Sequence, residues 1–280
     1  MSKHRIVIEP DTINSNYWKD LWNFRGLFYF LAWRDILVRY KQTAIGILWS
    51  LLRPMLTITV MAFIGWLFKS NIPDGIPRLV FVAAATLPWT FFSSSFSEAS
   101  NSLVANSNLL TKVYFPRLIV PASTVIVCVI DFFISFAILI VLMVFCRYTP
   151  DIRILFLPLF LLLALVTSMG TGLYIAALNV KYRDFRYVVP FIVQFGLYAS
   201  PIAFSSNDIY SNEHIPAVLK IMYSLNPMVG VIDGFRWCIF GGNISLNMQG
   251  FIISIGISIL FLFFGVWYFR RMEKSFADVI

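Results

Sequence analysis

The sequence predicts an all-α integral membrane protein: six transmembrane helices, an N-terminal amphipathic helix, and two short re-entrant helices between the fifth and sixth spans. Composition is the first reason. Of 280 residues, 59% are hydrophobic and 13% charged, with a mean hydropathy of +0.78, whereas a soluble domain is about 45–50% apolar and about a quarter charged. Lipid must therefore be part of the solvent. Disordered chains, collagen, disulfide scaffolds and ordinary cytosolic enzymes are excluded by the same figures.

The second reason is that apolar runs of roughly 20 residues, the length that crosses a bilayer, recur along the chain. Six runs are present, at about 48–68, 79–97, 118–146, 154–178, 187–205 and 250–269. No short apolar core with a small-residue cleavage site precedes the first run, so we expect no signal peptide. The expected parts are a cytoplasmic N-terminus (1–47), a transmembrane domain (48–269) and a cytoplasmic tail (270–280).

The charge distribution predicts the orientation. Six spans place both termini on one side, and that side carries 15 of the 22 Lys and Arg residues against 6 on the other. Since basic loops stay in the cytoplasm, both termini are expected there. The net charge of +8 is then an orientation signal and a contact with anionic lipids, and it calls for no nucleic-acid partner.

The segment 14–40 is expected to form one amphipathic helix, with Asn14, Ser15 or Asn16 as its N-cap. Its apolar residues recur at helical spacing: Trp18, Leu21, Trp22, Tyr29, Ala32, Trp33 and Ile36. An aromatic-rich helix of this kind lies in the headgroup plane. Two interpretations stay open, a simple anchor and a helix that also shapes a lipid entry site.

The loop between the second and third spans alternates small polar residues with leucines. We expect a short helix near 106–112, capped by Ser107 or Asn108, that fits a groove on another protein. Its candidate contact residues are Asn106, Asn108, Leu109, Leu110 and Lys112. A plain surface turn is the alternative.

Residues 206–249 are longer than a connection requires. They combine Pro216, Pro227 and the Gly241-Gly242 pair with apolar stretches that are too short to span. This pattern is typical of two short re-entrant or interfacial helices on the outer side.

No catalytic or metal-binding pattern is present, so the chain is not expected to be an enzyme. The two histidines, His4 and His214, are isolated, and the three cysteines do not form a disulfide framework. Gly170-Thr171-Gly172 lacks the Gly-Lys-Ser/Thr of a phosphate-binding loop, and its small residues instead favour close helix approach. Energy for any transport must come from elsewhere.

Two ionisable residues fall within expected spans. Arg53, followed by Pro54, either extends to the cytoplasmic headgroups or holds a phosphate entering from the inner leaflet. Asp131 lies near the middle of the third span, where a charge is costly unless it is paired or solvated. It is a salt-bridge partner, a neutral hydrogen-bonded acid, or part of a polar conduit, and we favour structural pairing.

Aromatic residues make up 17% of the chain. Tryptophans near expected span ends are predicted to anchor the membrane interface; they are Trp49, Trp66, Trp89 and Trp267. Phe195, Tyr198 and Phe204 follow Gln194 in a stretch more polar than a lipid-facing helix. Their rings pack in a core or stack on sugar rings.

Several motifs, taken in order, resemble the membrane subunits of ABC-2 type polysaccharide exporters. They are Arg39-Tyr40-Lys41 with Gly46, Trp49 and Arg53-Pro54; the stretch from Asn108 to Arg117; Leu178-Asn179-Val180 with Tyr182-Arg183-Asp184; Ser200-Pro201-Ile202; and Leu225-Asn226-Pro227 with Phe235-Arg236. The resemblance covers about residues 17–272.

The resemblance implies a permease that dimerises, binds two copies of a separate nucleotide-binding subunit, and carries lipid-linked polysaccharide such as O-antigen across the bacterial inner membrane. It implies a coupling helix near 106–112, periplasmic gate helices within 207–240 and an interface helix at 17–40. The first and fifth spans would line a channel at the dimer interface, with Arg53, Trp49, Tyr198 and Phe204 near the path. ATP and Mg²⁺ would bind the partner subunit, and no cofactor would bind this chain.

Other cargoes and classes remain open. Capsule, teichoic acid or a hydrophobic drug are alternative cargoes for the same architecture. An ATPase-independent lipid-glycan flippase is the rival outside ATP-driven transport. A membrane glycosyltransferase would need an acidic catalytic cluster, which no loop contains, and a purely structural scaffold is the remaining alternative.

Overall fold

The structure, a computed structural model, describes residues 17–41, 46–182, 184–273 and 276. Within these residues it is entirely helical, without strands. Five helices are long and apolar enough to cross a membrane. They are α3 (Gly46–Leu67), α4 (Arg78–Ala105), α6 (Ile119–Phe145), α7 (Leu157–Lys181), which follows the 3₁₀ turn η1 (Ile152–Phe156), and α12 (Met248–Glu273).

The fifth expected span, 187–205, is the one that differs. It is α8 (Phe185–Ala199), a helix of 15 residues, about 22 Å long at the usual helical rise. Ser200 is extended, with φ −99° and ψ 151°, because the proline that follows disfavours a helical conformation at the residue before it. The six-span prediction is therefore not confirmed for the described residues, which contain five long spans and one shorter apolar helix.

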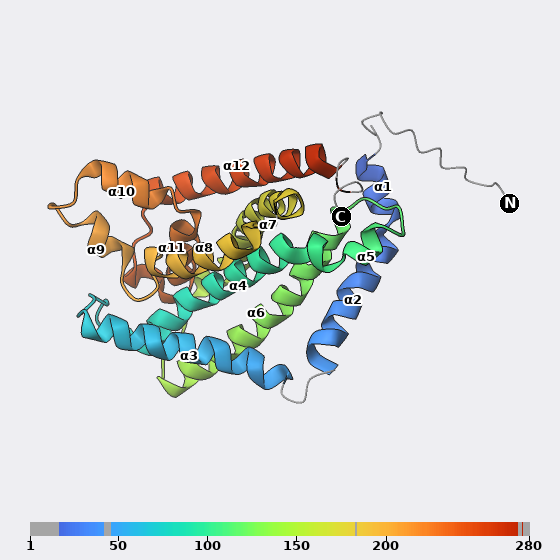
Figure 1. The fold of residues 1–280 in the computed structure, drawn as a ribbon. Helices are drawn as coiled ribbons and strands as arrows, with labels where there is room; N and C mark the ends of the chain where they lie inside the picture. The colour runs from blue at the N-terminus through green and yellow to red at the C-terminus, as the bar shows by residue number, and fades with distance from the viewer. Residues whose placement is uncertain (1–16, 42–45, 183, 274–275, 277–280) are drawn as a thin grey trace.

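The long helix α4 forms the centre of the bundle. Its apolar window is 83% buried, against 22–33% for the other four spans, and it packs against α3, α6, α7, α8 and the short helix α11 (Pro227–Phe240). Figure 1 shows α4 running between α7 and α6, with α12 on the far side of α7. The other spans keep wide exposed apolar faces, as expected for helices that contact lipid.

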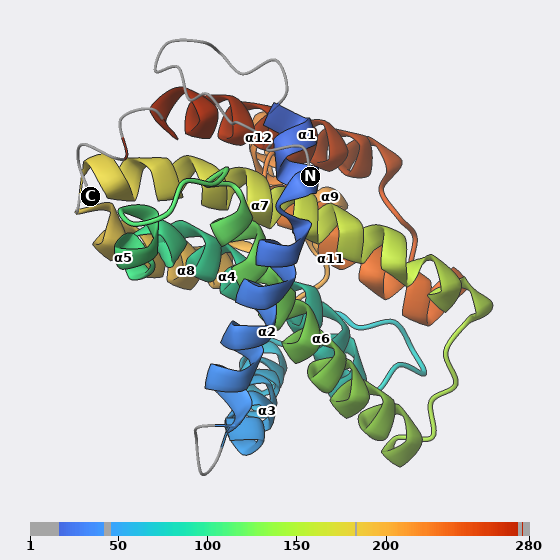
Figure 2. The same cartoon turned by 90° about the vertical axis from the view of Figure 1, so that its right-hand side faces the viewer.

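The expected interface helix is two helices, α1 (Tyr17–Asn23) and α2 (Arg25–Lys41). They are separated at Phe24, whose carbonyl accepts from Leu27 N and Phe28 N. Figure 2 shows the pair crossing one end of the bundle. Trp18, Trp22, Tyr29 and Trp33 are each more than half exposed, while Leu31 and Ala32 on the other face are buried. The expected caps at Asn14 to Asn16 lie outside the described residues.

The same end of the molecule, here called the α5 end, carries α5 (Ser107–Leu110). Its N-cap is Asn106, without a side-chain cap bond, so the expected cap at Ser107 or Asn108 is wrong. A separate apolar cluster forms at this end from α1, α2, α5 and the end of α12; its members include Tyr17, Leu31, Leu110, Phe269 and Phe276. Phe276, which lies in the segment expected as a tail, is fully buried in this cluster.

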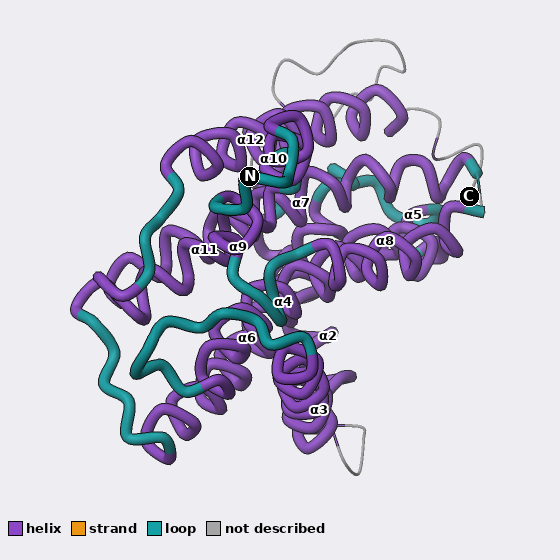
Figure 3. The backbone as a smooth tube through the Cα atoms, turned by 90° about the vertical axis from the view of Figure 1, so that its left-hand side faces the viewer, coloured by secondary structure: helices purple, strands orange, loops and turns teal. Residues whose placement is uncertain are grey.

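The opposite end, here called the α9 end, holds more helices than expected (Figure 3). Residues 206–249 form α9 (Ser206–Tyr210), α10 (Ala217–Ser224), α11 and the 3₁₀ turn η2 (Gly241–Asn243). α11 has 13 of its 14 residues buried, all but Trp237. Of these helices, α11 lies in the interior and packs on α4, α7 and α12.

The small residues Gly170 and Gly172 allow close approach of neighbouring helices, as predicted from the sequence. A Cβ at Gly170 would overlap the backbone of Leu262 in α12, and one at Gly265 would overlap Gly170 itself. A Cβ at Gly172 would lie 2.8 Å from the Cβ of Ala99. These glycines let α7 approach both α12 and α4 closely, which confirms the packing interpretation.

Candidate functional site

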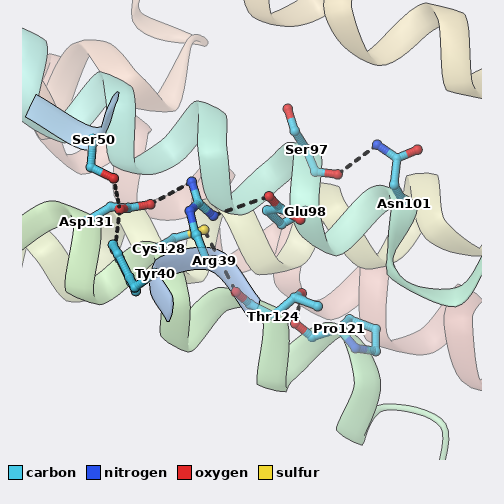
Figure 4. A network of polar contacts seen from close by, with 10 residues as sticks. All are labelled: Arg39, Tyr40, Ser50, Ser97, Glu98, Asn101, Pro121, Thr124, Cys128 and Asp131. Atoms are coloured by element: carbon cyan, nitrogen blue, oxygen red, sulfur yellow. Dashed lines mark hydrogen bonds and ion pairs between the residues drawn. The ribbon is translucent and has the colours of Figure 1, made fainter. Parts of the chain in front are cut away.

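The carboxylate of Asp131 on α6 is the centre of a polar network that joins four helices, α2, α3, α4 and α6 (Figure 4). Its Oδ2 lies 2.7 Å from Nη2 of Arg39. Its Oδ1 accepts from Tyr40 Oη at 2.5 Å and from Ser50 Oγ at 3.1 Å. Arg39 also lies 3.4 Å from Oε1 of Glu98 on α4.

This network closes the connection between α2 and α3. Arg39 and Tyr40 are at the end of α2 and Ser50 is in the first turns of α3, so one carboxylate holds the chain on both sides of the connection. The side chains of Arg39 and Asp131 are 33% and 18% exposed, so the ion pair is partly solvated. Among the three interpretations of Asp131, the structure places it in an ion pair.

The segment around α5 is anchored by some of its candidate residues and offers others outward. Asn106 Oδ1 accepts from Arg34 Nη2 at 2.9 Å, and this bond joins α2 to the start of α5. Leu110 is buried in the apolar cluster of the α5 end, and Leu109 is partly buried. Asn108 and Lys112 are exposed. Of the five candidate contact residues, these two are the exposed ones.

The helix α8 has an exposed aromatic face. Tyr187, Phe191, Phe195 and Tyr198 recur at helical spacing and are 58–71% exposed, and the rings of Phe191 and Phe195 stack at 6.4 Å. On its inner side, a Cβ at Gly196 would lie 2.5 Å from the ring of Trp89 on α4.

Trp89 is 4% exposed, so its expected place in an interfacial belt is wrong: it lies in the middle of α4 and its ring packs against Gly196 of α8 and the ring of Phe92. Trp66 and Trp267 are exposed, as an interfacial belt requires.

The remaining path candidates lie on α3 and beyond α8. Arg53 is exposed, and its carbonyl accepts from Thr57 Oγ1 at 3.0 Å. Trp49 lies in α3, but its side chain is outside the described residues. Phe204, which follows α8, is partly buried. α3 and α8 both pack on α4.

Two buried charges on α11 form a site that sequence reasoning missed. Asp233 and Arg236 are 8% and 1% exposed, and both bond to the segment between α8 and α9. Burial raises the pKa of Asp233 to about 6, although Ser206 and Arg236 oppose the rise. Burial lowers the pKa of Arg236 to about 10. The signal in the sequence was that Arg236 belongs to Phe235-Arg236, one of the motifs that resemble the exporter family.

Metal and thiol chemistry find no support among the described residues. These contain no group of three His, Cys, Asp or Glu residues able to hold a metal ion. The three cysteines are free, and Cys128 and Cys238 are buried.

Comparison with known proteins gives one family and several relatives. The family model described as ABC-2 type transporter matches residues 26–240. The O-antigen export system permease protein RfbA of Myxococcus xanthus is 26% identical over 263 residues, which cover 94% of this chain and 98% of that protein. A protein of the same name from Klebsiella pneumoniae is 26% identical over 88% of this chain and 92% of its own length. The polysialic acid transport protein KpsM of Escherichia coli is 24% identical over 86% of this chain and 92% of its own length.

Proposed function

Because the chain belongs to the ABC-2 type transporter family, we propose that it is the channel-forming permease of an ATP-driven exporter of lipid-linked polysaccharide. The cargo is O-antigen-like and crosses the bacterial inner membrane. The observation that carries this proposal is the exposed aromatic face of α8. Aromatic rings stack weakly on sugar rings, and a series of weak contacts suits a chain that must keep moving. Relatives named for O-antigen and polysialic acid export support a glycan cargo.

In this proposal the path runs between α3 and α8 of two copies of the chain. Phe195, Tyr198 and Phe204 face the glycan, and Trp49 and Arg53 lie on α3 beside it. Arg53 holds the lipid-linked phosphate as it enters from the cytoplasmic leaflet, since a guanidinium matches phosphate geometry. The exposed aromatic face of α1 and α2 lies in the headgroup plane of the same leaflet.

Energy comes from two ATPase subunits, which bind ATP and Mg²⁺. They contact the exposed Asn108 and Lys112, and the Arg34–Asn106 bond carries the movement of α5 into α2. With the basic loops on this side, both termini are cytoplasmic and the α9 end faces the periplasm.

The test is reconstitution of the chain with a candidate P-loop subunit in proteoliposomes, with lipid-linked glycan as cargo. Glycan should stimulate ATP hydrolysis and appear in the lumen. Tyr198→Ala should slow its appearance several-fold. Phe263→Ala should not, because Phe263 is equally exposed but lies on α12.

Four results would count against the proposal or a part of it. Failure of glycan to stimulate ATP hydrolysis would refute it, and equal effects of the two substitutions would refute the path along α8. Transport without any P-loop subunit would favour a flippase. Preference for lipid-linked polysialic acid over O-antigen would favour the alternative cargo, the glycan for which the KpsM relatives are named.

A further inference from the structure

The segment of residues 200–206, here called the strap, joins α8 to α9 and is bonded along its length to α11. Asn226, the N-cap of α11, donates from Nδ2 to Ser200 Oγ at 3.1 Å. Arg236 donates from Nη2 to the carbonyl of Ile202 at 3.0 Å and from Nη1 to that of Phe204 at 2.9 Å. Ser206 Oγ donates to Asp233 Oδ1 at 2.5 Å. Four bonds thus fix six residues of irregular backbone and the first residue of α9.

Two of the residues that make these bonds are buried charges, which are costly to place in an interior. Arg236 has the largest fully buried side chain among the described residues, and its guanidinium lies 3.7 Å from the ring centre of Phe81 on α4. Asp233 lies one turn before it on α11. Packing alone would be served as well by apolar side chains. Charge-assisted bonds to backbone atoms instead fix the course of a segment.

The other side of the strap meets the first span. A Cβ at Gly65 of α3 would lie 2.5 Å from the carbonyl oxygen of Ala203, so only glycine leaves room for this approach. Gly65 is close to the α9 end of α3, which finishes at Leu67. The strap therefore lies between α11 and α3 and starts at the α9 end of α8. At the α9 end, the strap thus follows α8 in the chain and contacts α3, the two helices that line the proposed path.

We propose that Asp233 and Arg236 are gate-positioning residues that hold the strap against α3 and so set the width of the path at its α9 end. This inference rests on the proposed function and assigns the residues that regulate its exit. Opening requires the strap to leave the clamp formed by Asp233 and Arg236. Arg236 Nε and Tyr223 Oη are buried without a hydrogen-bond partner in the described residues, and they provide donors for a displaced strap.

The test measures the reactivity of a cysteine in the strap. The reporter is Ala203→Cys in a Cys146→Ala background, in the complex with its ATPase subunits in lipid nanodiscs. A charged, water-soluble maleimide is the probe. Ser206→Ala removes the donor to Asp233, and Arg236→Lys keeps the charge but cannot reach both carbonyls. Ser205→Ala is the matched control, since Ser205 precedes α9 and makes no side-chain cap bond.

Ser206→Ala and Arg236→Lys should each raise the rate at the reporter about tenfold or more, as expected when a hydrogen bond to a charged group is lost. Ser205→Ala should match the parent. Adding ATP and Mg²⁺ should raise the labelling rate of the reporter cysteine in the parent and have little further effect in Ser206→Ala. A merely structural role of the clamp would not produce this difference between the two proteins.

Unchanged reporter rates in the two clamp variants would overturn the proposal, as would the absence of an ATP effect in the parent. The native Cys238, fully buried on α11, reports on folding. If the clamp variants accelerated labelling of Cys238 as much as labelling of the reporter, α11 itself would have loosened. That result would also overturn the proposal. Labelling requires no cargo. A failed glycan assay with the expected labelling pattern would therefore refute the cargo and leave the clamp standing.

Discussion

Replacing Asp131 with asparagine should destabilise the chain by about 1–3 kcal/mol, the usual loss for a hydrogen-bonded charge pair. Asparagine keeps Oδ1 as the acceptor for Tyr40 and Ser50. Its amide nitrogen, however, would replace Oδ2, which in the parent lies 2.7 Å from Nη2 of Arg39. Two hydrogen-bond donors would then face each other. The pair is 33% and 18% exposed, so the loss stays below the 3–5 kcal/mol of a fully buried pair. Asp131→Ala loses all three partners and should reach about 3–5 kcal/mol.

The assay is equilibrium unfolding of the purified chain in mixed micelles, followed by helical circular dichroism. A double-mutant cycle of Asp131→Asn with Arg39→Gln should give a coupling energy of about 1–2 kcal/mol. Glu98→Gln is the matched control. Glu98 also pairs with Arg39, but its Oε1 lies 3.4 Å from Nη1 of Arg39 and its side chain is 49% exposed. It should cost less than about 1 kcal/mol.

Export by the folded Asp131→Asn variant separates the remaining interpretations. If Asp131 only holds α2, α3 and α6 together, export per folded molecule should stay close to that of the parent. A variant with parental stability and no export would refute the structural reasoning and place Asp131 in a polar conduit. A coupling energy near zero would refute the ion pair itself.

Three further predictions follow from packing, burial and the α5 end. Gly265→Ala should destabilise the chain by about 1–3 kcal/mol, because its Cβ overlaps Gly170; Gly256→Ala on the same helix meets open space and should be neutral or slightly stabilising in the same unfolding assay. The pKa of Asp233, raised from 3.8 to about 6, means that the folded state holds its proton more tightly than the unfolded state. The contribution of Asp233 to stability should therefore be greatest below pH 3.8 and be lost, by at most about 3 kcal/mol, as the pH rises from 3.8 through 6; melting curves of Asp233→Asn should lack this fall. Asn106→Ala removes the bond to Arg34 and should lower the glycan exported per ATP hydrolysed in proteoliposomes while basal hydrolysis persists; an unchanged ratio would exclude a role in coupling.

Much of the fold was predictable because span length and hydropathy are local properties of the chain. The helices α3, α6, α7 and α12 lie where the apolar runs predict. The extent of α4 was not predictable from its apolar run. Residues 98–105 include Glu98 and Asn101, and they are helical because α7 covers them: Asn179 donates to the carbonyl of Ser100 at 2.7 Å. Hydropathy records transfer to lipid, and α4 is surrounded by protein instead.

Some residues of the candidate site could likewise be predicted from the sequence, and others could not. Asp131 stood out because one acid within an apolar run is visible in the sequence. Its partners Arg39 and Tyr40 did not, since they precede it by about ninety residues and only packing of α2 on α6 brings them together. Asp233 and Arg236 looked like ordinary loop charges, because α11 is too short and too interrupted by glycine to predict an interior helix. Their role became visible only with the course of the strap.

The burial of α4 also constrains how the chain is made. Its helix carries Ser93, Ser94, Ser95, Glu98 and Asn101, and its apolar window has a hydropathy of 1.5 against 3.1 for α6. Such a segment partitions poorly into hydrocarbon by itself. Of the five helices that pack on it, α3 precedes it, whereas α6, α7, α8 and α11 leave the ribosome after it. During synthesis, therefore, most of the surface that α4 buries in the folded chain has no neighbour from this chain until α6 and α7 arrive, and the insertion machinery must shield it in that interval.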